Sequence, residues 1–266
     1  MRDKINSAIN GSYCFIFLLI ISGIFDGVLS ELFYYAAFIV PICLGIIVIR
    51  KGNAGSSENQ LDIGIKLNTD GILTAIPLIL PIISATALIS LATSEFMYLF
   101  VKTNSAAFDE PFILSLLLHA LVPAIFEELL FRYVPLKLLK DTPRCAVAVS
   151  ATLFAFAHVN AFQIPYALFA GALFAMLCYA TGSVIPSIAV HTLNNVFSLT
   201  IIYGYDGRAF YITAAILLAV STVFVAVRGK HYIALAKKTL EGKIIITREL
   251  AVFMAFTSAI AILNLF

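Results

Sequence analysis

The stretch PFILSLLLHALVPAIFEELLFR, residues 111–132, decides the fold class of this chain. Its first part, 111–126, is almost entirely apolar, and it is followed by Glu127, Glu128 and Arg132. An apolar run of this kind suits the hydrocarbon core of a bilayer, which a helix of about 20 residues spans. A charged side chain at the centre of such a helix costs roughly 2.5–3.5 kcal/mol on insertion scales. Three charged residues together at such a position therefore indicate a chemical function.

The composition of the whole chain is that of a membrane protein. Hydrophobic residues make up 61% of the 266 residues, charged residues make up 12%, and the mean hydropathy is +1.00. Soluble domains are about half apolar and a quarter charged. We therefore expect an all-α fold, a polytopic transmembrane helical bundle that forms one integral membrane domain over residues 1–266. The net charge of +2, without basic runs mixed with aromatic residues, gives no indication of nucleic-acid binding.

Uncharged stretches of bilayer-spanning length predict about eight or nine helices. We expect them at roughly 9–25, 32–49, 71–94, 112–131, 145–160, 163–180, 184–204, 209–227 and 249–266. Within the sixth of these, Gly171 and Ala175 form a pair of small residues four apart, a spacing that favours close approach of a neighbouring helix. The segment 51–70 is predicted to be a loop without room for a domain.

Lysine and arginine mark the cytoplasmic side of a membrane protein. In this sequence they are concentrated in some of the expected connections and scarce in the others. Arg2 and Lys4 place the N-terminus inside, and basic residues also follow the second, fourth and eighth expected helices. We therefore expect a multi-pass protein, in a bacterial plasma membrane, with a cytoplasmic N-terminus and an outside C-terminus. Because Lys137, Lys140 and Arg144 follow the fourth helix, a cavity near Glu127 is expected to open towards the cytoplasm or into the inner leaflet.

The two adjacent glutamates point about 100° apart on a helix, so they cannot face one cavity equally. Glu128 and Arg132 are four residues apart in the acid-first order, which predicts an ion pair along the helix, at the membrane surface. That pair would orient the site rather than react. Glu127 is then left without a local counter-charge, which makes it the candidate for chemistry.

Three further polar residues occur on the next expected helices. His158 closes the segment FAFAH, and His191 precedes Asn195 by four residues, so that both lie on one helix face, whereas Asn194 is rotated away. Each residue alone is better explained by hydrogen bonding between helices. Together with Glu127 they lie on successive segments that short loops make neighbours, and we expect all four to converge on one cavity.

This set of side chains supports two kinds of hydrolytic site. A carboxylate beside an imidazole can take a proton from water, while a second imidazole and a carboxamide can donate to an oxyanion. Glu127, His158 and His191 would also serve as zinc ligands with water in the open position. Nucleophilic catalysis fits less well. No base lies at helical spacing from Ser150, Ser183, Ser187 or Ser198, and Cys14, Cys43, Cys145 and Cys178 form no CxxC pair.

The pattern EExxxR at 127–132, FxxxH at 154–158 and HxxxN at 191–195 resembles the three motifs of the CAAX protease and bacteriocin-processing family, also called CPBP or Abi. Tyr133 and Pro135 after the first motif, and the segment 182–186 before the third, agree as well. The resemblance covers about 112–199, the expected catalytic core.

The resemblance implies an intramembrane endopeptidase that acts on membrane-associated peptides or proteins. Carried over by position, Glu127 and His158 would activate water, and His191 and Asn195 would hold the oxyanion. Glu128 and Arg132 would orient the site. The family has been described both as metal-independent glutamate proteases and as metalloproteases. No cofactor is therefore firmly implied, and zinc stays an open alternative.

Two other function classes remain open at this point. A proton-coupled transporter would use the same acid and histidines as a relay, but it predicts polar residues spread along a pathway. A non-catalytic immunity or scaffold protein would keep the fold without the reaction. One geometric difficulty also arises, because Glu127 is expected near the cytoplasmic end of its helix while His158 lies about 20 Å along the next one. We expect the helix boundary near Cys145 to be wrong.

Overall fold

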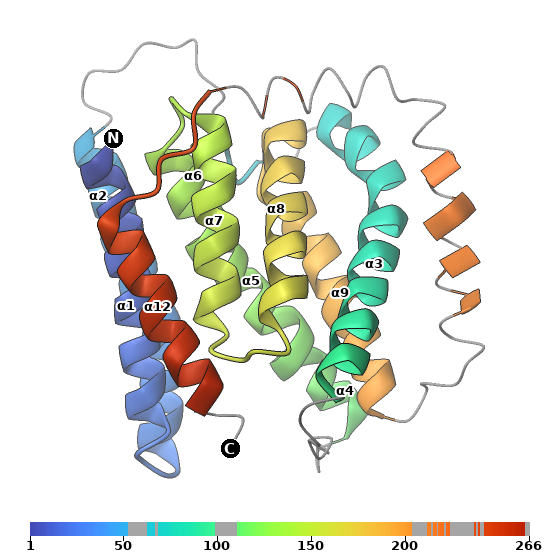
Figure 1. Ribbon diagram of the computed structural model, residues 1–266, viewed down its shortest axis with the longest axis horizontal. Helices are drawn as coiled ribbons and strands as arrows, with labels where there is room; N and C mark the ends of the chain where they lie inside the picture. Colours follow the sequence, from blue (N-terminus) through green and yellow to red (C-terminus); the bar gives the residue numbers. More distant parts are fainter. Residues whose placement is uncertain are drawn as a thin grey trace.

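The computed structural model describes residues 1–52, 63–66, 69–98, 111–203, 212–213, 215–216, 218–220, 222–223, 237, 239 and 242–263. Seven helices in this part of the chain are uninterrupted. They are α1 (Arg2–Ser22), α2 (Val28–Gly52), α3 (Thr69–Tyr98), α7 (Pro143–Ala157), α8 (Ile164–Thr181), α9 (Ile185–Ile202) and α12 (Arg248–Leu263). An eighth consists of consecutive segments, α4 (Phe112–Ser115), η1 (Leu116–Leu121), α5 (Val122–Glu128), η2 (Leu129–Tyr133) and α6 (Val134–Leu138) (Figure 1).

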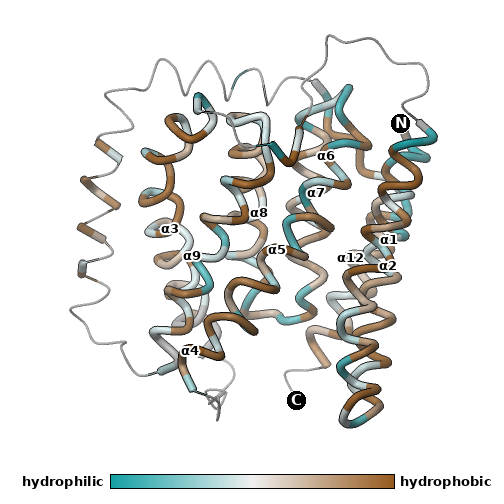
Figure 2. The backbone as a smooth tube through the Cα atoms, turned by 180° about the vertical axis from the view of Figure 1, so that it is seen from behind, coloured by the Kyte–Doolittle hydropathy of each residue, from teal (hydrophilic) through white to brown (hydrophobic). Residues whose placement is uncertain are grey.

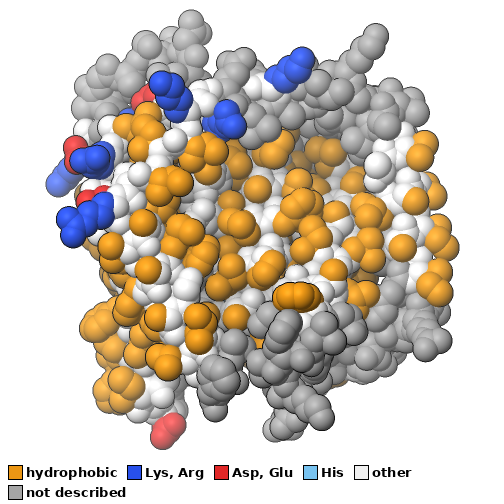
Figure 3. Space-filling model, viewed as in Figure 1, with side chains coloured by type: hydrophobic (Ala, Val, Ile, Leu, Met, Phe, Trp, Pro, Cys, Tyr) orange, Lys and Arg blue, Asp and Glu red, His pale blue; other side chains and the backbone are white. Residues whose placement is uncertain are grey.

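The predicted all-α membrane bundle is confirmed. Five helices of the described part are long and apolar enough to cross a bilayer: α1, α2, α3, the segmented helix Phe112–Leu138, and α8. Figure 2 shows hydrophobic residues along most of their length, and Figure 3 shows an outer face that is largely hydrophobic. A folded protein that presents so much apolar surface is stable in lipid rather than in water, so this is an integral membrane protein.

The predicted spans agree with the observed helices to within a few residues at most boundaries, with two exceptions of note. The first helix begins at Arg2 rather than near residue 9, and the fourth runs to Leu138 rather than to 131. The predicted span at 209–227 lies largely outside the described residues. Of the predicted loop at 51–70, the first two and last two residues belong to α2 and α3, and the structure describes 63–66 between them. There, the Gly64 N–H donates to Gly182 O and Gly64 O accepts from Val184 N–H, so that this segment is fastened to the α8–α9 turn.

The expected error at Cys145 is not the one that the structure reveals. Helix α7 begins at Pro143, slightly earlier than predicted, and the longer fourth helix resolves the geometric difficulty instead. Because that helix continues for eleven residues after Glu127, the carboxylate lies about 16 Å inside the helix end at 1.5 Å per residue. This depth matches His158 at the far end of the antiparallel α7.

Two π-helical turns, η1 and η2, interrupt the helix that carries the glutamates, and each stands just before a proline. Pro123 and Pro135 have no N–H, and a proline ring clashes with the carbonyl four residues earlier, on His119 and Phe131. Both carbonyls belong to the wide turns. The Phe131 carbonyl, which has lost its α-helical donor, accepts a hydrogen bond from the Ser150 hydroxyl of α7. The prolines thus account for the wide turns, and the freed carbonyl binds α7.

Helices α7 and α8 approach closely at Gly171, as the small-residue pair predicted. A β-carbon on Gly171 would lie 3.0 Å from the Ala151 Cα and 3.2 Å from the Phe154 ring. Gly11 of α1 has more space, since a β-carbon there would lie 3.8 Å from Pro41. The absence of a side chain at Gly171 therefore sets the distance between the two helices that carry Phe154 and Phe174.

We expect Gly171→Ala to destabilise the protein by about 1–3 kcal/mol, because overpacking forces two helices apart. Gly11→Ala is the matched control, since both residues are helical and both gain the higher helix propensity of alanine. Thermal unfolding of both purified variants in one detergent measures the effect. Equal melting temperatures for the two variants would contradict the close contact.

Candidate active site

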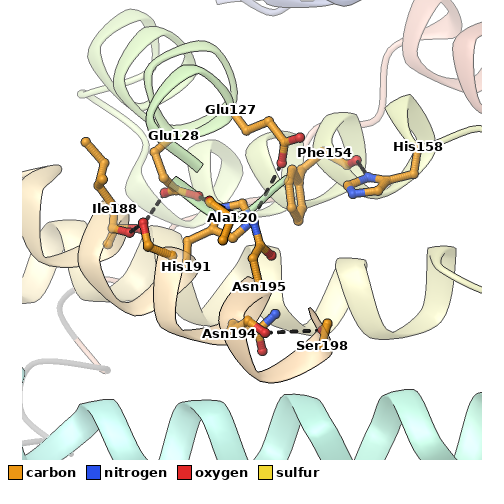
Figure 4. A network of polar contacts seen from close by, with 12 residues as sticks. Ala120, Glu127, Glu128, Phe154, His158, Ile188, His191, Asn194, Asn195 and Ser198 are labelled. Carbon is orange, nitrogen blue, oxygen red and sulfur yellow. Dashed lines mark hydrogen bonds and ion pairs between the residues drawn. The ribbon is translucent and has the colours of Figure 1, made fainter. Parts of the chain in front are cut away.

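One cavity of about 210 Å³ collects the four side chains that were predicted to converge. Glu127 comes from α5, His158 from the end of α7, and His191 and Asn195 from α9 (Figure 4). The other lining residues are His119, Pro123, Phe154, Gln163, Tyr166, Ala170, Phe174, Asn194, Ser198 and Leu199. The predicted convergence is therefore present, while the catalytic role of each residue stays a prediction.

The Glu128 carboxylate is the most heavily bonded group of the site. It is fully buried, its Oε1 accepts from His191 Nδ1 at 2.8 Å, and its Oε2 accepts from the Ser187 hydroxyl. Arg132 Nη1 lies 3.2 Å from Oε1. A buried carboxylate is tolerated only when such partners replace water. Glu128 thereby connects its own helix to α9 at two points.

The Arg132 guanidinium is fully buried as well, and its surroundings are mostly aromatic. It lies 3.8 Å above the centre of the Phe154 ring and 5.3 Å from that of Phe174. Nη1 is close to Glu128 but is not aligned as a hydrogen bond, and the other guanidinium nitrogens have no hydrogen-bond partner. Charge attraction and cation–π contact therefore hold this side chain. The predicted pairing with Glu128 is present, and both side chains are fully buried within the protein, while its predicted place at the membrane surface stays a prediction.

His191 lies between the two glutamates. Its Nδ1 must donate to Glu128, because a carboxylate oxygen can only accept, and its Nε2 lies 3.6 Å from Glu127 Oε2. A neutral imidazole with its proton on Nδ1 would turn a lone pair towards the Glu127 carboxylate. The geometry therefore places an imidazole nitrogen and a carboxylate within reach of each other in the cavity wall.

His158 also has one of its two ring nitrogens engaged in a hydrogen bond. Its Nδ1 lies 2.8 Å from the Phe154 carbonyl, an acceptor, so Nδ1 carries the proton and a neutral ring keeps Nε2 free to accept one. The Phe154 ring meets the imidazole edge to face at 4.7 Å. Helix α7 ends here because Val159 has φ +49°, a left-handed conformation that a β-branched residue rarely adopts. The strained turn leaves His158 at the rim of the cavity.

The two asparagines of α9 have different surroundings. Asn194 was expected to be rotated away, but it lines the same cavity, with its Oδ1 accepting from the Thr86 hydroxyl of α3 at 2.6 Å. Asn195 Nδ2 donates to the Ala120 carbonyl of η1 at 3.4 Å, beyond the ordinary range of N–H···O bonds. The Asn195 amide is therefore loosely held and able to donate to another oxygen.

Sequence reasoning missed Ser187 and Thr86 as supports of the site. The statement that no base lies at helical spacing from Ser187 is wrong, because Ser187 precedes His191 by four residues and lies on the same face of α9. In the structure Ser187 is fully buried and lines neither the cavity described above nor any other described one. Its hydroxyl binds Glu128 and is out of reach of a substrate.

The zinc alternative requires Glu127, His158 and His191 to act as ligands of one metal ion. Among the described residues, no group of three His, Cys, Asp or Glu side chains is arranged to hold a metal ion. Nδ1 of His158 and Nδ1 of His191 are both engaged, which leaves their Nε2 atoms and Glu127 as the groups that a metal would have to gather. Zinc-binding histidines commonly have their second ring nitrogen engaged in this way, so the zinc alternative stays a prediction.

The cavity lies in the half of the bundle away from the N-terminus, and its predicted opening towards the cytoplasm or the inner leaflet stays a prediction. Lys4 pairs with Asp141 at 3.0 Å, which brings the N-terminus to the α6–α7 turn, and the described basic side chains gather there (Figure 3). The cavity is instead lined by His158 and Gln163, at the α7–α8 connection, which Figure 1 places towards the opposite end.

Comparison with known proteins supports the resemblance that the three motifs suggested. Residues 109–197, about a third of the chain, match the family model described as type II CAAX prenyl endopeptidase Rce1-like. The matched stretch contains all three motifs, and it also contains Glu128 with its partners Arg132, Ser187 and His191. No curated protein and no solved structure matches the chain.

We expect Arg132→Met to destabilise the protein by about 3–5 kcal/mol, because it leaves Glu128 charged and buried without its cation. The double variant Glu128→Gln with Arg132→Met removes both charges and should recover part of that loss. Arg144→Met is the control, because Arg144 is an exposed arginine. Thermal unfolding in detergent tests this, and additive effects of the two single substitutions would exclude a coupled pair.

Proposed function

We propose that this protein is an intramembrane endopeptidase that hydrolyses peptide bonds with water activated by Glu127. The observation that carries the proposal is the placement of Glu127 and His191 Nε2 3.6 Å apart in the wall of a cavity inside a membrane bundle. The family match supports it, because the matched model describes CAAX prenyl endopeptidases. We infer substrates of the same kind, membrane-associated peptides or protein tails.

The reaction begins with a water molecule between Glu127 and His158. Glu127 takes one proton from the water, and the free Nε2 of His158 accepts a hydrogen bond that aims the oxygen. The water oxygen then bonds to the scissile carbonyl carbon, and the carbonyl oxygen becomes an oxyanion. A carboxylate that is partly shielded from solvent, with 18% of its side chain exposed, suits this role better than one in water.

The oxyanion is received by His191 and Asn195. The Glu128 carboxylate stabilises a protonated His191 through Nδ1, so Nε2–H is available to donate. The loosely held Asn195 amide supplies a second donor. Glu127 then returns its proton to the nitrogen of the scissile bond, that bond breaks, and the amine leaves. Water has been consumed, and no covalent enzyme intermediate is needed.

The transporter alternative receives less support from this geometry. A proton relay requires polar groups spaced along a path, whereas Glu127, His158, His191 and Asn195 meet around one cavity. A non-catalytic protein of the same fold is separated from an enzyme by the assay below.

Glu127→Gln should abolish cleavage while leaving the fold intact, because the amide cannot take a proton from water. The assay uses purified protein in liposomes with prenylated and unprenylated CAAX-type peptides and a mixed library of membrane peptides. Glu249→Gln, an exposed glutamate of α12, is the matched control. Full activity in Glu127→Gln, or no cleavage of any peptide by the unchanged protein, would overturn the proposal.

The same liposome preparation tests whether cleavage depends on a bound metal ion. Chelation with measured metal content is expected to leave activity in place. If it removes stoichiometric zinc together with activity, and zinc restores both, then Glu127, His158 and His191 are ligands and the direct role of Glu127 as base is wrong.

Asn195→Ala should lower kcat by about a hundredfold or more with little change in KM, as loss of an oxyanion donor does. Asn10→Ala, an exposed asparagine of α1, serves as the comparison. A rise in KM with kcat unchanged would assign Asn195 to substrate binding instead.

A further inference from the structure

A second cavity lies on the other side of Glu127 and His158. It measures about 170 Å³ and is bounded by α1, α2, the helix of the glutamates and the end of α7. Its walls are Phe15, Leu19, Tyr34, Phe38, Phe131 and Ala157, together with the two site residues. Glu127 and His158 therefore line both the polar cavity and this aromatic one.

The aromatic cavity has a preformed wall. The rings of Phe15 and Phe38 lie 4.8 Å apart, those of Phe15 and Phe131 lie 5.5 Å apart, and Phe38 stacks on Phe126 at 5.4 Å. Phe15, Phe38 and Phe131 are buried. Tyr34 packs edge to face against Phe38 at 5.6 Å. Rings held in this way keep the cavity open without a ligand, because none can turn into it without losing its neighbours.

The size of the cavity limits what it can hold. An apolar cavity of about 150 Å³ in another protein accommodates benzene, so one of about 170 Å³ has room for one aromatic or branched aliphatic side chain. Apart from the two site residues, the Tyr34 hydroxyl is the one polar side-chain group among its lining residues. The occupant that fits is small and apolar.

We propose that the aromatic cavity is a specificity subsite that receives one apolar side chain from a substrate residue next to the scissile bond. The proposal rests on the proposed function. The scissile carbonyl must lie at Glu127 and His158 to be attacked, and the aromatic cavity begins at those same two residues. A neighbouring side chain of the substrate thus reaches the aromatic cavity, while the scissile carbonyl lies in the polar one. A lipid chain in this cavity is the competing occupant.

Leu19 offers a way to change the cavity with little disturbance of the core, because it is only partly buried. Leu19→Trp fills the space, and Leu19→Ala enlarges it. Ile20→Trp is the matched control, since Ile20 is the next residue of α1, is 49% exposed and does not line the cavity. The substrates are peptides that differ only in the residues flanking the cleaved bond, which are alanine, valine, leucine or phenylalanine.

At one flanking position the unchanged protein should prefer leucine or phenylalanine over alanine by about 10–200-fold in kcat/KM. In Leu19→Trp that ratio should fall about tenfold or more, and in Leu19→Ala it should shift towards phenylalanine. Ile20→Trp should keep the original ratio. If a Leu19 variant melts far below the unchanged protein, the other variant carries the test.

Two results would overturn the subsite. One is a preference ratio that neither Leu19 variant changes. The other is an equal loss of cleavage for all peptides together with a changed response to the acyl-chain length of the liposomes, which assigns the cavity to lipid. Failure of the proposed function gives a different result. In that case the Glu127→Gln variant and the unchanged protein cleave every peptide at equal rates, or neither protein cleaves any peptide.

Discussion

The buried Glu128 carboxylate is the constraint on which the rest of the site depends. It accepts hydrogen bonds from Ser187 and His191 of α9 and faces the Arg132 guanidinium of its own helix. A carboxylate without water must be surrounded in this way, or it is neutralised or expelled. These contacts hold α9 against the glutamate helix at one depth and one rotation. The position of His191 in the cavity, and the state of its ring, follow from that.

The wide turns η1 and η2 explain how so irregular a helix survives inside a bilayer. Backbone groups in lipid must be satisfied within the protein, and the prolines at 123 and 135 each remove a donor. The Phe131 carbonyl, four residues before Pro135, accepts from Ser150 of α7 instead. The Ala120 carbonyl of η1 also receives a long contact from Asn195 of α9. At η2, the side chain that replaces the missing donor therefore comes from a helix that carries the site.

The sequence alone was sufficient for the fold class and for the set of residues that meet. Apolar length identifies spans, and lone polar groups within them identify the site. The sequence alone did not predict how deeply the charged side chains are buried. The spacing of Glu128 and Arg132 describes one helix, whereas their complete burial depends on α9 and on the rings of Phe154 and Phe174. Likewise the second cavity arises between α1, α2, the glutamate helix and the end of α7, an arrangement that no local pattern encodes.

Two adjacent glutamates have different roles here because one histidine contacts both. On a helix the two side chains diverge by about 100°, so Glu128 points into the protein while Glu127 faces the cavity. His191 closes this angle, since Nδ1 and Nε2 lie on different edges of one rigid ring and reach Glu128 at 2.8 Å and Glu127 at 3.6 Å. An asparagine or glutamine could donate to Glu128 but has no second ring nitrogen to turn towards Glu127. The two contacts therefore depend on a histidine at this position, and the depth at which α9 is fixed determines whether that histidine can reach both glutamates.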